Sequence, residues 1–106
     1  MRLKDRAVEA RLLKIERTLV STGHLFKSAS AKGDAGDQQA GAIAEAMLHK
    51  QRLLVEQAAD IRPVSIIGLA AKARIAGHHL DMPTAGRVVV RSLVEDLHAL
   101  EPLRRR

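Results

Sequence analysis

The sequence predicts an all-α protein, a small bundle of about four helices with a flexible loop after the first. Apolar residues recur at alternating spacings of three and four through most of the chain, which is the period of an amphipathic helix. No run of residues shows the partnered, alternating pattern that a sheet would need. The chain has 106 residues, the length of one ordinary domain, so we expect 1–106 to form a single helical domain.

The first helix is expected from Leu3 to about Val20. Its apolar stripe has the helical spacing throughout and consists of Val8, Leu12, Ile15 and Leu19. Gly23 is expected to end it. The following residues, 21–37, are rich in Gly, Ser and Asp, which loosen the chain or compete with regular backbone hydrogen bonds. We therefore expect 21–37 to be a flexible loop.

A second helix is expected from Asp37 or Gln38 to about Ala59. Its stripe consists of Ile43, Met47, Leu54 and Ala58. Gln51 interrupts this stripe, and we interpret it as lying at the edge of the stripe and bonding to water. The alternative is a buried polar residue of the kind that sets register or partner number in helical assemblies.

The third helix is expected to follow Pro63, because the residue before a proline is disfavoured in helices and Ser65 is a good N-cap. Its stripe consists of Ile66, Leu69, Ala73 and Ala76. Gly77 is expected to end this helix in a left-handed conformation.

The fourth helix is expected to begin after a turn over 81–84, with Asp81 or Thr84 as its cap, and to stop at Pro102. Its stripe consists of Val90, Leu93, Leu97 and Leu100. The β-branched run 88–90 is the one argument for a strand, but it lies inside the longer helical pattern. We therefore predict a helix.

Composition excludes several kinds of site. Phe26 is the one aromatic residue, which disfavours base-stacking platforms for single-stranded nucleic acid. The absence of Cys removes disulfides and thiolate metal sites. The chain has no apolar run long enough to span a membrane and no secretory signal pattern at its start, so we expect a cytoplasmic protein without membrane contact.

Catalysis and cofactors are not expected. None of the five histidines has a same-face histidine three or four residues away, so the sequence predicts no metal site. Ser65 and Ser92 stand in no nucleophile motif; Ser65 reads as a cap, and Ser92 is four residues before Asp96, where the two could share a hydrogen bond. An enzyme would need a cofactor or a site shared with a partner.

Basic residues crowd the second half of a chain whose net charge is +6. The candidate nucleic-acid contacts are Lys72, Arg74, Arg87, Arg91, Arg104, Arg105 and Arg106. The third and fourth helices loosely imitate a helix-turn-helix, but Pro83 lies in the connection and the run of valines leaves few polar side chains to read bases.

One segment resembles a known pattern. Residues 63–74 read Pro-Val-Ser-Ile-Ile-Gly-Leu-Ala-Ala-Lys-Ala-Arg, and residues 92–97 read Ser-Leu-Val-Glu-Asp-Leu. This pair is similar to segments of small bacterial helical proteins that show Pro-Ala-Thr-Thr, Gly-Leu and Ala-Lys, then Ser-Leu-x-x-Asp-Leu; here Ser65-Ile66 replaces Thr-Thr. The resemblance implies a bacterial origin, and it implies no activity and no site residues.

We therefore expect a non-enzymatic interaction protein, whose apolar stripes are completed by a second copy or by another protein. The alternative is a small basic regulator that binds nucleic acid through phosphate contacts.

Overall fold

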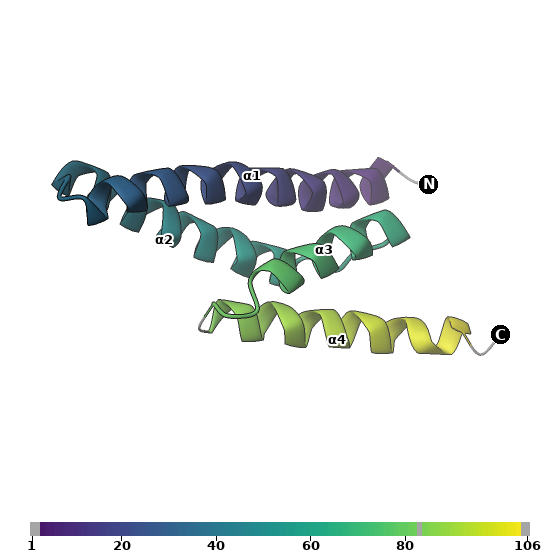
Figure 1. Ribbon diagram of the computed structural model, residues 1–106. Coiled ribbons are helices and arrows are strands. Elements are labelled where there is room, and N and C mark those ends of the chain that lie inside the picture. The colour runs from purple at the N-terminus through teal and green to yellow at the C-terminus, as the bar shows by residue number, and fades with distance from the viewer. Residues whose placement is uncertain (1–2, 83, 105–106) are drawn as a thin grey trace.

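The computed structural model describes residues 3–82 and 84–104, and these form four α-helices and no strand. The helices are α1 (Leu3–Asp34), α2 (Gln38–Asp60), α3 (Ile66–His78) and α4 (Ala85–Arg104). In Figure 1, α2 lies between α1 and α4, and α3 crosses beside them near the end that carries the chain termini. The predicted all-α class is confirmed, and residues 88–90 are helical.

The predicted flexible loop over 21–37 is wrong, because α1 continues as one helix to Asp34. Its second half packs on α2 and buries Thr22 and Ala29. The Thr22 hydroxyl donates to the carbonyl oxygens of Thr18 (2.9 Å) and Leu19 (3.1 Å), so a residue that often interrupts helices is satisfied within this one. Tertiary packing therefore outweighs the weak local helix preference of this segment.

The true end of α1 is a tight turn around Gly36. Gly36 has a φ of 104°, its N–H donates to the carbonyl of Gly33, and the N–H of Asp37 donates to the carbonyl of Lys32. These two bonds make a Schellman cap. The Asp37 side chain then accepts from the N–H of Ala40 at 3.0 Å, which starts α2 where the sequence predicts. The connection is a short helical hairpin.

The core lies where α1, α2 and α3 meet, and the start of α4 completes it. Leu12, Ile15 and Leu19 of the predicted first stripe are buried. In α2 the buried face is rotated from the prediction: Ile43 is exposed, and Val55 and the small alanines face inward. Gln51 is only 8% exposed, so its predicted place at the edge of the stripe is wrong.

The third helix begins as predicted, with the Ser65 hydroxyl accepting from the N–H of Gly68 at 3.1 Å. Its predicted stripe is only partly right, because Ala76 is buried but Ala73 is exposed. Ile66 is 86% exposed, whereas the inner face consists of Gly68, Ala71, Lys72, Ile75 and Ala76. Small residues permit close helix contact, so the largest apolar side chains need not mark the buried face.

The fourth helix buries Ala85 and Val89 but leaves Val94 and Leu97 exposed. Its bounds extend two residues beyond Pro102, to Arg104. The side chain of Leu100, which belongs to the predicted stripe, lies outside the described part of the chain.

Candidate functional site

A fully buried lysine joins three helices. The Lys72 side chain has no exposed surface, and its ammonium donates to the Ile61 carbonyl (2.9 Å), the Ser92 hydroxyl (2.7 Å) and the Asp96 carboxylate (2.6 Å). An ammonium has three N–H donors, so all of them are used. A buried charge paired and hydrogen-bonded in this way is tolerated where an isolated one would not be.

The partners of Lys72 are themselves held in place. Ser92 donates its proton to the carbonyl of Ala59, at the end of α2. The Asp96 side chain is 6% exposed, and its other oxygen lies 4.0 Å from the Arg62 guanidinium. Among the described residues no buried side-chain polar atom lacks a hydrogen-bond partner. The hydroxyl proton and the ammonium protons are all committed, so this cluster is arranged to hold helices rather than to attack a substrate.

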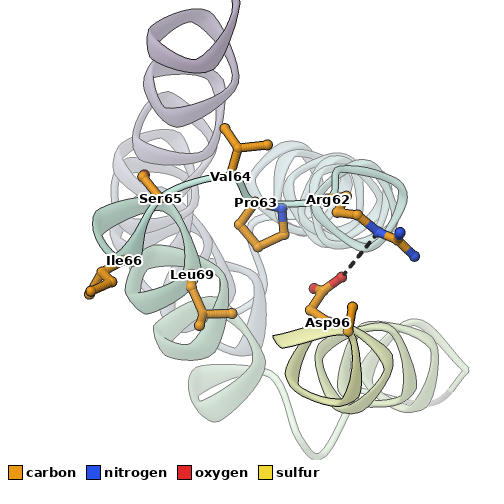
Figure 2. Close-up of a pocket in the computed structure, with 8 residues that line it drawn as sticks. Arg62, Pro63, Val64, Ser65, Ile66, Leu69 and Asp96 are labelled. Carbon is orange, nitrogen blue, oxygen red and sulfur yellow. Dashed lines mark ion pairs between the residues drawn. The ribbon is translucent and has the colours of Figure 1, made fainter. Parts of the chain in front are cut away.

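The cluster lies beside a hollow that we call the end cleft, shown in Figure 2. The end cleft has a volume of about 280 Å³ and lies between the α2–α3 connection, the start of α3 and the second half of α4. Its apolar lining residues are Pro63, Val64, Ile66, Leu69 and Ala99. Arg62 and Asp96 give it a polar side. An apolar hollow with few polar groups is suited to receive an apolar side chain.

The rim of the end cleft is apolar and exposed. Val64 and Ile66, which line the cleft, are exposed by 52% and 86%, respectively. The rim is also anchored to α1, because the Ser65 hydroxyl donates to the Glu9 carboxylate at 3.1 Å while it caps α3. The apolar side chains are therefore presented on a fixed piece of backbone.

The structure separates the predicted nucleic-acid contacts. Lys72 is buried and paired, so its ammonium cannot reach a phosphate in this conformation. Arg74 makes two hydrogen bonds to the Glu16 carboxylate, at 2.5 and 2.9 Å. These bonds lower the pKa of Glu16 and raise the pKa of Arg74. The α1–α3 contact therefore already uses the charge of Arg74.

The remaining predicted contacts belong to or follow α4. Arg87 and Arg91 are exposed and four residues apart, so they share the outer face of α4. Arg104 is the last residue of α4, and Arg105 and Arg106 lie outside the described residues. Among the predicted contacts whose side chains the structure describes, Arg87 and Arg91 are the two exposed residues that share a face.

The sequence did not single out the end cleft or the Lys72 cluster. One signal was present: Ser92 and Asp96 have the helical spacing that puts both on one face. Their common partner could not be predicted. Lys72 is surrounded by alanines in the sequence, and most of the large apolar side chains of α3 do not lie on its buried face. Lys72 lies in residues 63–74, and Ser92 and Asp96 lie in residues 92–97, so these two segments meet in the cluster.

Comparisons with protein-family models, curated proteins and solved structures gave no match. Within the described ranges, no helix is both long and apolar enough to cross a membrane. No group of three or more His, Asp or Glu side chains in those ranges is placed to hold a metal ion.

Proposed function

We propose that this protein is a non-enzymatic interaction module that self-associates, and that the end cleft is the contact between two copies. The observation that carries the proposal is the amount of exposed surface. The chain exposes 7535 Å². A compact protein of its mass, 11.6 kDa, exposes about 5,800 Å². The excess of roughly 1,700 Å² is about twice what one partner contributes to a standard interface.

The shape accounts for this excess. The molecule measures 59 × 27 × 15 Å, and its radius of gyration is 16.0 Å. A compact chain of this length has a radius of gyration of about 13 Å. The helices thus form a long, thin arrangement, with apolar side chains such as Ile66 and Leu97 left uncovered. Association would cover part of that surface.

A second copy suits the end cleft because the projecting side chain and the hollow that would receive it lie on the same surface. Ile66 projects from the rim of an apolar hollow that it also helps to line. In a two-fold interface the same patch meets itself, so Ile66 of each copy could enter the cleft of the other. The fixed Ser65 cap favours such a contact, since a preorganised side chain loses little freedom on binding.

The test compares two glutamate substitutions at exposed apolar positions by sedimentation velocity over a range of protein concentrations. Ile66→Glu puts a charge into the proposed contact and should give a monomer where the natural chain forms a dimer. Leu80→Glu is the matched control, because Leu80 is 64% exposed and lies beyond the other end of α3. Helicity of both variants is checked by circular dichroism. A natural chain that stays monomeric at high concentration, or equal effects of the two variants, contradicts the proposal.

Nucleic-acid binding is the second candidate function, favoured by the exposed, same-face pair Arg87 and Arg91. With two arginines to neutralise phosphates, the affinity for duplex DNA should depend only weakly on salt concentration. Two neutralised phosphates correspond to a slope of about −2 in log affinity against log salt. Loss of binding in the Arg87→Gln/Arg91→Gln double variant supports this role, and unchanged binding removes it. The proposed setting for either role is the bacterial cytoplasm.

A further inference from the structure

A second hollow lies at the other end of α3, and we call it the histidine cleft. It has a volume of about 320 Å³ and lies between the middle of α1, Gln51 of α2 and the last turn of α3. The fold brings His24 of α1 close to His78, the last residue of α3, and to His79, which follows it, although His24 is far from both in the sequence. Leu19, Val20 and Ile75 provide its apolar lining.

Gln51 is the feature that distinguishes this cleft from an ordinary surface hollow. Its side chain lines the cleft although the residue is 8% exposed, and its amide makes no hydrogen bond to any described residue. Among the described residues, every fully buried side-chain nitrogen or oxygen atom has a hydrogen-bond partner. The Gln51 amide must therefore open into the cleft. An amide that opens into a hollow and has no protein partner forms its hydrogen bonds there with water or with a ligand.

Gly23 leaves space for this amide. A Cβ placed at Gly23 would lie 3.3 Å from Nε2 of Gln51, closer than an ordinary contact. The missing side chain at position 23 therefore lets the amide reach α1 beside the cleft. Gln51, the polar residue that interrupts the predicted stripe of α2, therefore lies against Gly23 of α1.

The ammonium of Lys27 and the hydrogen-bonding histidine rings around the cleft suit an anion. Lys27 and His24 are exposed at its α1 side, and His78 is exposed at its α3 side. The one carboxylate in the lining, that of Glu16, is occupied by two hydrogen bonds from Arg74. Nδ1 of His79 donates to the Ile75 carbonyl at 2.9 Å, which holds that ring at the end of α3.

We propose that the histidine cleft binds a small organic monocarboxylate with an apolar tail. The carboxylate accepts hydrogen bonds from the Gln51 amide and the Lys27 ammonium, and the tail lies on Leu19, Val20 and Ile75. This assignment uses a mostly apolar hollow with a few convergent polar groups, the usual composition of a small-molecule site. It is independent of the proposed self-association, because the end cleft lies at the opposite end of α3.

The experiment titrates the full chain with hexanoate and follows backbone, methyl and side-chain amide signals by NMR. Hexanoate should give saturable shifts at the Gln51 side-chain amide and at the methyl groups of Leu19 and Ile75. Two further probes separate the parts of the ligand. Hexanol has the tail without the charge, and acetate has the charge without most of the tail, so each should bind at least about tenfold more weakly. Equal shifts with hexanol, or no saturable shift with hexanoate, overturn the proposal.

Two variant pairs assign the contacts. Lys27→Met should weaken hexanoate binding by about fivefold or more, the effect of about 1 kcal/mol. Lys50→Met, an exposed lysine of α2 outside the cleft lining, should leave binding unchanged. Gln51→Leu should abolish saturable binding, and Gln57→Leu on the exposed side of α2 should not. Lys27 is exposed, so its substitution does not threaten the fold; equal affinity in Lys27→Met and Lys50→Met overturns the placement of the carboxylate.

Discussion

At the scale of single residues, one buried ion pair determines how the second half of the chain is held. Lys72 is the largest fully buried side chain among the described residues, and its ammonium contacts the end of α2 and two side chains of α4. A hydrophobic residue of similar size could fill the same volume without these constraints. The pair therefore fixes which parts of three helices meet, and it places Asp96 at the side of the end cleft.

Removing the lysine alone should be strongly destabilising. Lys72→Met leaves the Asp96 carboxylate buried with only the distant Arg62 as an ion partner, and losing one partner of a buried pair costs about 3–5 kcal/mol. The double variant Lys72→Met/Asp96→Leu should recover most of that loss, because both charges are then gone. Urea unfolding followed by circular dichroism measures the free energy of unfolding of both variants. If Lys72→Met unfolds at the same urea concentration as the natural chain, the cluster is not a structural lock.

Sequence reasoning identified residues of this cluster without recognising their relation. It gave Lys72 an external role as one of the basic residues that crowd the second half of the chain, whereas this lysine is one of the few that are fully buried. Helical spacing placed Ser92 and Asp96 on one face, but the hydrogen bond expected between them is replaced by a bond from Lys72 to each, while Ser92 donates to Ala59. It could not show that Lys72 comes from another helix to join them, since that contact spans 24 residues in sequence and depends on how the helices pack.

At the scale of helices, small residues determine the packing. A Cβ placed on Gly33 would lie 3.0 Å from Cα of Gly41, so α1 and α2 touch backbone to backbone near their hairpin. A Cβ on Gly86 would lie 2.5 Å from the carbonyl oxygen of His79, so α4 begins directly against the preceding turn. The helix count and most helix starts could be predicted from caps and periodicity. The buried faces of α2 and α3 could not, because their contacts are made by alanine and glycine.

Two glycine-to-alanine substitutions in helices should have opposite effects. Gly86→Ala should destabilise the protein by about 1–3 kcal/mol, since its Cβ would overlap a backbone oxygen and overpacking has costs of this size. Gly77→Ala should stabilise it by about 0.5–1 kcal/mol, because nothing lies within 4 Å of the added Cβ and alanine is the better helix former. Thermal unfolding of both variants measures this contrast. A Gly86→Ala variant that unfolds at the same temperature as the natural chain or above it would mean that α4 does not pack on the turn as described.

At the scale of the whole molecule, the thin shape and the net charge have opposite effects on self-association. The excess exposed surface favours association, whereas two chains that each carry +6 repel each other. Added salt is therefore expected to strengthen self-association, whereas it should weaken binding to an acidic partner. An acidic protein or a nucleic acid gains attraction from the same charge and loses it when salt is added.

Salt should strengthen the proposed dimer. Raising ionic strength from about 0.1 M to 1 M shortens the screening length from about 10 Å to 3 Å, which removes most of the repulsion between the two copies. The apolar contact at the end cleft is not weakened by the added salt, so the dissociation constant of the dimer should fall severalfold. Sedimentation velocity at both salt concentrations measures it, and the Ile66→Glu variant should remain monomeric at both. A dissociation constant that rises with salt would mean that charge attraction holds the copies together, and the apolar end cleft would then not be their main contact.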